Sequence, residues 1–270
     1  MKYIKLFENF ESDDKQKELA DELAAYLGVN LETFSETSKI MAMSPEGIQR
    51  WFNAEMDKEE PNMPVIEELE RLGYKFDLLN KDLLYAAQHN KVGLAKLLLD
   101  RGAKIDARDE NQRTPLHFAA GYNSRAVAEL LLDRGADKDA RNNWQSTPLH
   151  LAAWNDSRAV AELLLDRGAK IEARDDEQRT PLDTAAREDS RAVAELLLDR
   201  GAKIDVRNEY QQTSLHLAAW NDSRAVAELL LDRGADYEVR DKYQQTPLHY
   251  AIDNDYEEIA ELLRSRGATE

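Results

Sequence analysis

Cysteine is absent from this sequence of 270 residues. The chain therefore forms no disulfide, and it carries neither a thiolate nucleophile nor a cysteine ligand for a metal. Long apolar runs are missing too, since no stretch approaches the ~20 residues that a membrane-spanning helix requires. The first residues, Met1–Glu8, reach an acidic side chain too early for a secretory signal. These absences favour a cytoplasmic protein, made in or delivered into a host cell, with no membrane association.

Basic residues are scarce, because 36 Lys and Arg face 53 Asp and Glu and leave a net charge of −17. Positions 1–80 hold 9 basic and 18 acidic residues, and the remainder holds 27 and 35. Binding to a phosphate backbone depends on Lys and Arg, so nucleic acid is not an expected partner. Acidity of this kind keeps a repetitive surface soluble. The alternative is an acidic mimic of nucleic acid that inhibits a nucleic-acid-binding protein.

Two repeated motifs organise the chain. Thr-Pro-Leu-His-Phe-Ala-Ala at 114–120 returns every 33 residues, with changes, at 147–153, 180–186, 213–219 and 246–252, after a degenerate copy at 81–87. Ser-Arg-Ala-Val-Ala-Glu-Leu-Leu-Leu-Asp-Arg-Gly-Ala is identical at 124–136, 157–169, 190–202 and 223–235. A period of this length is typical of proteins built from stacked supersecondary units.

Each unit has the pattern of two helices. Thr114 suits an N-cap, and Pro115 suits the first helical position, where its missing N–H is not needed. Ser124 is placed to start a second helix with apolar side chains at helical spacing, and Gly135 is placed to end it with positive φ. The turn between the helices also needs positive φ, which Asn and Asp tolerate well. Its residues are Asn90, Asn123, Asp156, Asp189, Asp222 and Asp255.

With these motifs the chain resembles the ankyrin-repeat family from Lys81 to Glu270. The resemblance implies an all-α solenoid of stacked helix pairs with short β-hairpin loops. The six repeats are expected at 81–113, 114–146, 147–179, 180–212, 213–245 and 246–270. Glutamine replaces the family's usual hairpin glycine, a change expected to alter the turn, at Gln112, Gln145, Gln178, Gln211 and Gln244. Asp183 replaces the motif histidine and Ser214 the motif proline, so the fourth and fifth repeats are expected to be locally softer.

The N-terminal third departs from this pattern. Residues 64–77 echo the second helix of a repeat and its exit, so 45–80 is interpreted as a degenerate capping repeat. Residues 1–44 are interpreted as a small helical segment, with a helix over 15–27. Residues 36–54 weakly resemble a helix-turn-helix, which makes DNA binding a further alternative. That alternative is disfavoured because the segment offers few basic contacts to phosphate.

Catalytic residues, metal ligands and cofactor motifs are not apparent. Four of the five histidines, His117, His150, His216 and His249, belong to the repeated motif, where the family resemblance implies structural hydrogen bonds. His89 is the remaining one and has no recurrent ligand partner. No metal-spaced histidine pair, phosphate-binding glycine loop or nucleophilic serine motif is present. We therefore expect no enzyme activity, no metal and no cofactor.

Variation between copies of one unit indicates where binding takes place. The copies differ three positions and one position before each motif Thr, and just after each Ala-Ala pair. The resemblance places these positions on hairpin tips and first-helix ends that line a concave groove. Trp, Tyr and Arg are enriched at interface hot spots, although scattered exposed aromatics also occur without function. The expected partner-binding residues are Tyr122, Trp144, Trp154, Tyr210, Trp220 and Tyr243, with Arg113, Arg179 and Arg187 supplying charge.

The sequence therefore predicts a monomeric protein-binding module, which acts as an adaptor, effector or inhibitor on a protein partner of unknown identity. Near-identical repeats indicate recent duplication. The family resemblance associates such repeats with symbionts, parasites, large viruses and phages, so a counter-defence inhibitor is included among the alternatives.

Overall fold

Helices make up the regular secondary structure of the computed structural model, which describes residues 31–41, 43–56, 58, 62–72 and 83–269. The chain divides into two units, one formed by Met1–Asp82 with Lys91–Leu97 and the other by Leu83–Asn90 with Leu98–Glu270. The helix expected over 15–27 lies outside the described residues, as do positions 73–80 of the expected capping repeat. Each unit is considered separately below.

Residues 31–71 of the first unit contain three described helices, α2 (Leu31–Met41), α3 (Pro45–Met56) and α4 (Met63–Arg71). Ile40, Ile48, Val65 and Leu69 form a buried cluster in which each of the three helices takes part. Two acidic residues are buried beside this core, and each forms an ion pair with a basic side chain. Glu55 lies 2.6 Å from the Lys58 amine, and Glu68 accepts two hydrogen bonds from the guanidinium of Arg71.

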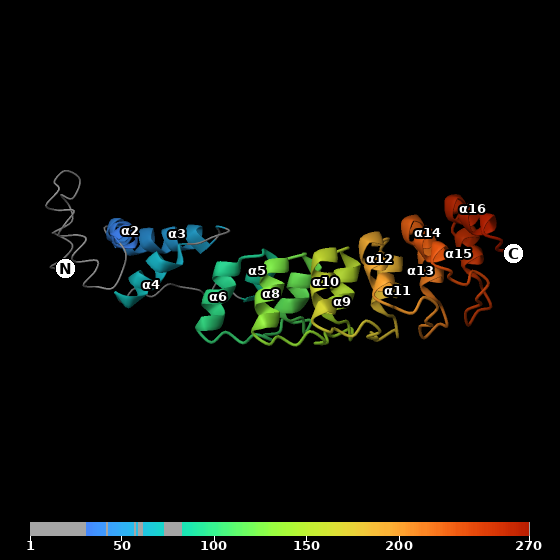
Figure 1. The fold of residues 1–270 in the computed structure, drawn as a ribbon, viewed down its shortest axis with the longest axis horizontal. Helices are drawn as coiled ribbons and strands as arrows, with labels where there is room; N and C mark the ends of the chain where they lie inside the picture. Colours follow the sequence, from blue (N-terminus) through green and yellow to red (C-terminus); the bar gives the residue numbers. More distant parts are fainter. Residues whose placement is uncertain (1–30, 42, 57, 59–61, 73–82, 270) are drawn as a thin grey trace. The chain divides into compact units, whose positions relative to one another are not determined.

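The second unit is a row of helix pairs that lie side by side along the chain (Figure 1). It begins with α5 (Leu83–Gln88); the next helix, α6 (Val92–Asp100), is assigned to the first unit as far as Leu97. The next pairs are α7 (Pro115–Gly121) with α8 (Arg125–Asp133), α9 (Pro148–Trp154) with α10 (Arg158–Asp166), and α11 (Pro181–Arg187) with α12 (Arg191–Asp199). The last are α13 (Ser214–Trp220) with α14 (Arg224–Asp232) and α15 (Pro247–Asp253) with α16 (Glu257–Ser265). First helices pack on neighbouring first helices, and the short alanines Ala119 and Ala120 of α7 are fully buried there. This arrangement confirms the all-α repeat fold.

In α7, α9 and α13 the motif histidine links the first helix to the next repeat. Thr114 has the extended conformation of an N-cap, and its backbone N–H donates to Nδ1 of His117 over 3.1 Å. Because Nδ1 accepts, the ring proton lies on Nε2, which donates to the Ser146 carbonyl at 3.0 Å. His150 and His216 repeat this bond to the carbonyls of Arg179 and Gln245. Burial lowers the pKa of all three rings to about 4, so they are neutral at pH 7.

Turn residues take the left-handed conformation at the expected places. The Asn and Asp residues between paired helices have φ of 50–59°, and Gly135 has φ of 90°. The hairpin glutamines, expected to alter the turn, also adopt positive φ, between 55° and 63°. The turn therefore closes normally in a loop such as 141–146, where Gln145 N–H donates to Asn142 O and Asn142 N–H donates to Ser146 O. No strand is assigned in the described residues, so the hairpins consist of these turn bonds alone.

Candidate protein-binding surface

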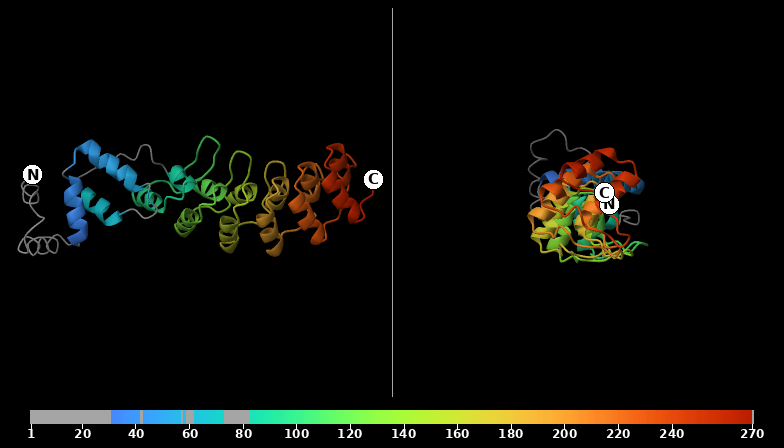
Figure 2. Two further views of the ribbon diagram at one scale, coloured as in Figure 1. Left: turned by 90° about the horizontal axis from the view of Figure 1, so that it is seen from above. Right: turned by 90° about the vertical axis from the view of Figure 1, so that its right-hand side faces the viewer.

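Five loops of one design project from the helix pairs on the same side (Figures 1 and 2). We name them the finger loops; they comprise 108–113, 141–146, 174–179, 207–212 and 240–245. The second residue of each is Asp or Asn, which organises the loop. In the second finger loop the Asn142 side-chain oxygen accepts from the backbone N–H groups of Trp144 (2.9 Å) and Ser146 (3.0 Å). The other four loops repeat this bond two residues along. A local Asx turn thus sets the direction of the variable residues.

Neighbouring finger loops are joined through their backbones. Asn143 N–H donates to Asn111 O, and Asp176 N–H donates to Trp144 O, each at 3.0 Å. Equivalent bonds join the third loop to the fourth and the fourth to the fifth. The finger loops are also joined to the first-helix ends, because the Gln245 side-chain amide donates to Asp253 at 3.0 Å. We name the finger loops together with these helix ends (121–122, 154–155, 187–188, 220–221 and 253–254) the finger surface.

The expected aromatic anchors are accessible on the finger surface. The exposed fractions are 57% for Tyr122, 49% for Trp144, 46% for Trp154, 48% for Trp220 and 62% for Tyr243, whereas Tyr210 is half-buried. These side chains are therefore not part of the repeat core. Each leaves part of its apolar ring exposed to solvent.

Several of the rings are held by neighbours. The Trp220 and Tyr250 ring centroids are 4.9 Å apart, and the Arg187 guanidinium lies 5.2 Å from the Trp154 ring centroid. The Lys242 amine lies 3.7 Å from the centroid of Tyr210. Contacts of this kind restrict rotamers before binding and so reduce the entropy lost on association.

The three arginines expected to supply charge are paired within the chain. Arg113 donates to Asp109 at 2.8 Å, and Arg187 lies 3.4 Å from Glu188. Arg179 is the most enclosed, with a side chain only 15% exposed and contacts to Asp175 and Glu177 of its own loop. Because each guanidinium already has a carboxylate partner, these arginines support the loops more directly than they offer charge to a ligand.

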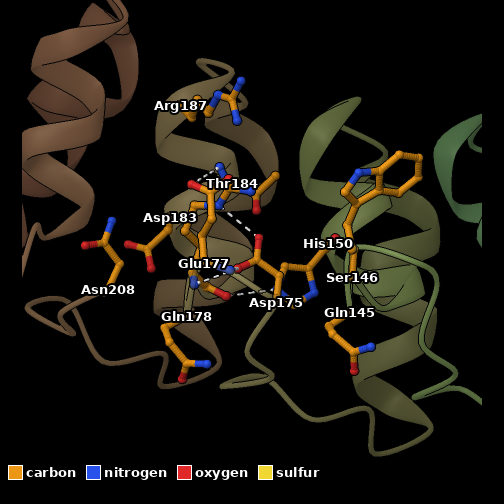
Figure 3. A network of polar contacts seen from close by, with 12 residues as sticks. Gln145, Ser146, His150, Asp175, Glu177, Gln178, Asp183, Thr184, Arg187 and Asn208 are labelled. Atoms are coloured by element: carbon orange, nitrogen blue, oxygen red, sulfur yellow. Dashed lines mark hydrogen bonds and ion pairs between the residues drawn. The ribbon is translucent and has the colours of Figure 1, made fainter. Parts of the chain in front are cut away.

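Asp183 and Ser214, the two departures from the motif, bond to each other. The Ser214 hydroxyl donates to Asp183 Oδ1 at 2.7 Å, and the Thr180 backbone N–H donates to Oδ2 at 2.8 Å. Both side chains are buried, and burial raises the pKa of Asp183 to about 6. Figure 3 shows the position of Asp183 beside Thr184. The link between repeats that a histidine makes elsewhere is thus replaced by a carboxylate–hydroxyl bond. The expected local softening therefore has a compensating contact, which sequence reasoning missed.

A second buried network was also not foreseen. Tyr250 donates its hydroxyl proton to Asp241 at 2.6 Å and accepts from the Gln212 side-chain amide at 3.0 Å. Burial and the Asp241 carboxylate raise the pKa of Tyr250, which therefore stays protonated at neutral pH. The feature of the sequence that could have indicated this network is Tyr250, which stands where several other repeats have an apolar residue of the motif. This network fixes the ring on which Trp220 packs.

In the first unit, the residues that a helix-turn-helix would use to read bases are bonded along their own helix. Gln49 donates to the Asn53 side chain at 3.2 Å, and Arg50 donates to the Glu46 carbonyl at 3.3 Å. The helices have the expected order, with a short turn between α2 and α3. Nothing in these contacts favours DNA binding over a helical packing role.

The described residues hold no group of three or more His, Asp or Glu side chains placed to bind a metal ion. None of the helices in the described part of the chain has the length and apolar character that crossing a bilayer requires.

Comparison with known proteins places the repeats in a family. The family model for ankyrin repeats matches residues 83–175, 139–208, 172–241 and 208–269. The crystal structure of the human ASB11 ankyrin repeat domain is similar, with 27% identity and a TM-score of 0.63 over 69% of this chain and 84% of that chain. No curated protein matches the sequence. The family match extends over more than half of the chain, and the chain therefore belongs to the ankyrin-repeat family.

Proposed function

We propose that the chain binds a partner protein through the finger surface and performs no catalysis. Ankyrin repeats indicate a protein–protein interaction module. The observation that carries the finer proposal is the contrast within the repeats, where an identical helical frame presents half-exposed aromatic residues that differ from copy to copy. Variation on a constant frame is the arrangement expected when the frame supports and the variable residues select the partner.

Trp154 and Trp220 are the proposed central anchors. They occupy the same position of the motif in two repeats, at the ends of α9 and α13, with exposed fractions of 46% and 48%. A Trp side chain that becomes buried at an interface contributes up to several kcal/mol. The contacts with Arg187 and Tyr250 hold both rings in place before the partner arrives. Binding to a largely preformed surface is therefore expected, with little change in the repeats.

The test is capture of the partner from an extract of the native host by immobilised protein, with identification by mass spectrometry. The variant Trp154→Ala with Trp220→Ala is expected to lose the captured protein while its melting temperature changes little. Tyr237→Ala with Tyr256→Ala is the control, because it removes two aromatic rings outside the finger surface. Capture that survives loss of the two tryptophans, or is lost equally in the control, contradicts the proposal.

The same capture experiment distinguishes the acidic nucleic-acid mimic. A mimic would bind a basic, nucleic-acid-binding protein, with an affinity that falls steeply with salt. Its binding would depend on carboxylates and be insensitive to Trp154→Ala with Trp220→Ala. Salt-insensitive capture that requires the tryptophans therefore excludes the mimic. Whether the module acts as an adaptor, effector or inhibitor follows from the identity of the captured protein.

A further inference from the structure

A column of five arginines follows the finger loops. Arginine is the first residue of every loop, and four of the five side chains are exposed. We name them the finger arginines; they are Arg108, Arg141, Arg174, Arg207 and Arg240. They do not vary between copies, and they are not among the residues expected from the sequence to bind a partner.

Each finger arginine is held through a single nitrogen. Nη1 of Arg108 donates to the carbonyl of Gln112 in its own loop at 3.0 Å and to the carbonyl of Arg141 in the next loop at 2.8 Å. Arg141 and Arg174 make the same pair of bonds, while Arg207 and Arg240 each make one of the two. These bonds use neutral acceptors, so they orient the guanidinium without neutralising its charge. Nε and Nη2 make no hydrogen bond within the described residues, and their edge is the one that grips a carboxylate in a two-pronged pair.

The finger arginines differ from the other arginines in this respect. Thirteen arginines in residues 83–269 have a carboxylate oxygen within 4.0 Å, among them Arg158 and Arg191 of the second helices. None of the five finger arginines has such a partner among the described residues. The chain has an excess of acidic side chains, so the lack of a partner in all five loops is a consequence of geometry.

The carboxylates close in sequence are engaged elsewhere. Asp109, Asp175 and Asp241, which directly follow a finger arginine, accept from backbone N–H groups of their own loops. A second carboxylate stands two residues before each finger arginine and accepts a hydrogen bond from a backbone N–H of the following repeat. For example, Asp139 accepts from Lys170 N–H at 2.9 Å and Glu172 accepts from Lys203 N–H at 2.8 Å. Asp205 likewise accepts from Asp236 N–H. These bonds fix the carboxylates at the joints between repeats, which leaves the finger arginines available to an external anion.

We propose that the partner presents an acidic segment to the finger arginines, with Asp or Glu carboxylates paired to successive guanidiniums. This inference rests on the proposed protein-binding function and specifies the chemistry of the partner. A pre-oriented guanidinium loses little rotamer entropy when it pairs, so this column is a better carboxylate receptor than free surface arginines. The net charge of −17 opposes the approach of an acidic segment. At physiological salt, however, charges beyond ~8 Å are screened, and the adjacent guanidiniums dominate at contact.

The spacing of the column suggests the conformation of that segment. Packed helices lie roughly 8–10 Å apart, and successive finger loops belong to successive helix pairs. A polyproline II segment has 3 residues per turn and a rise of about 3.1 Å per residue, so its same-face residues recur about every 9 Å. An extended chain with an acid at every third position therefore matches the column. A polyphosphate is a poorer fit, because one guanidinium per repeat neutralises few of its closely spaced charges.

The experiment uses fluorescein-labelled peptides and fluorescence anisotropy with the full chain. A peptide of five Glu-Pro-Ala units is expected to bind, and peptides of five Gln-Pro-Ala or Lys-Pro-Ala units are not. The variant Arg141→Gln, Arg174→Gln, Arg207→Gln is expected to weaken binding of the acidic peptide at least tenfold. Its matched control is Arg158→Gln, Arg191→Gln, Arg224→Gln, which removes the same charge from second-helix arginines with carboxylate partners and is expected to change binding less than twofold.

Three results would overturn the inference. They are failure of the wild-type chain to bind the acidic peptide, equal weakening by the two triple variants, and tighter binding of a single-stranded oligonucleotide of equal charge. A triple variant with lysine at 141, 174 and 207 keeps the charge and is expected to bind with intermediate affinity, which separates loss of the two-pronged pair from loss of the fold. If capture depends on Trp154 and Trp220 while the finger-arginine variants capture normally, this inference fails and the proposed function stands.

Discussion

The second helices and the finger loops of this protein use arginine in opposite ways. At the C-caps of the second helices, arginines pair with carboxylates of the preceding repeat, as Arg167 does with Asp133 at 2.8 Å and Arg200 with Asp166 at 2.7 Å. In the finger loops, arginines bond to neutral carbonyls and keep their charge. The arginines of the second helices are therefore neutralised within the chain. The finger surface, in contrast, retains exposed apolar rings and arginines without a carboxylate partner among the described residues. A surface built only for stability would not be expected to leave both unsatisfied.

The largest loss of stability is expected when a buried side chain of the helix pairs is truncated. Leu164 in α10 is fully buried, and Leu164→Ala is expected to destabilise the repeats by about 2–5 kcal/mol because it leaves a cavity. Trp144→Ala removes a larger side chain that is 49% exposed, and its effect is expected to stay below about 1 kcal/mol. Urea denaturation of both variants measures the difference. Equal destabilisation would show that Trp144 supports the helix pairs, and it would contradict the distinction between the helix pairs and the finger surface.

The second-largest effect is expected on acidification, which should lower the stability of the repeats. The folded pKa of about 4 for His117, His150 and His216 lies below the ordinary 6.5, so their stabilisation is complete above pH 6.5 and is lost as pH falls through about 4. Asp183 has the opposite sign, because its pKa is raised from 3.8 to about 6 and its stabilisation is lost as pH rises through 6. At pH 5.5 each histidine is expected to contribute a loss of about 1 kcal/mol, and Asp183 a gain of about 1 kcal/mol.

The net expectation is a lower urea midpoint at pH 5.5 than at pH 7. His150→Gln removes one titrating ring and is the control, since it should reduce the pH dependence. A midpoint that rises on acidification would show that the carboxylate outweighs the three rings.

The third-largest effect on stability is expected from substitutions at the Asp183–Ser214 junction. Ser214→Ala removes a donor from a buried carboxylate and is expected to cost about 1–2 kcal/mol. The double variant Asp183→His with Ser214→Pro restores the common motif and is expected to cost less than the sum of its single changes. A double-mutant cycle by urea denaturation measures this coupling. Additive effects would mean that the two departures are independent.

The smallest effect is expected in the finger turns. Gln178 has φ of 60°, a conformation that glycine adopts without a Cβ penalty, so Gln178→Gly is expected to stabilise by about 0.5–1 kcal/mol. Gln178→Ala keeps the Cβ and is the control, with no gain expected. Thermal melting distinguishes the two. A loss of stability on Gln178→Gly would indicate that the glutamine side chain itself supports the loop.

The repeat fold was predictable because period, cap and turn residues all repeat and so test one another. Thr114, Pro115 and Gly135 report local conformation, which a sequence carries directly. Exposure of Trp154 and Trp220 was predictable for the same reason, because residues that do not recur in every copy cannot form a repeated core.

Pairings across repeats were less accessible to sequence reasoning. The bond between Asp183 and Ser214 joins residues 31 positions apart, and it exists only because both copies changed. The pairing of Arg113 and Arg179 with carboxylates of their own loops was not anticipated from the sequence. Arg141 was not considered because the search was limited to positions that vary between copies, although an invariant position can also lack a carboxylate partner. The N-terminal third has no internal copies, so it offered no such test.

The constant interval between bonded partners has an evolutionary consequence. Arg108 bonds to Arg141 across 33 residues, and Arg141 bonds to Arg174 across the same distance. A recombination event that adds or deletes one whole repeat therefore leaves every such contact with a chemically equivalent partner. Asp183 with Ser214 is one exception and Gln212 with Tyr250 is another; a crossover between Asp183 and Ser214 would leave a buried carboxylate beside a proline. Lineages can lengthen or shorten this array freely, but they must inherit that junction as a single block.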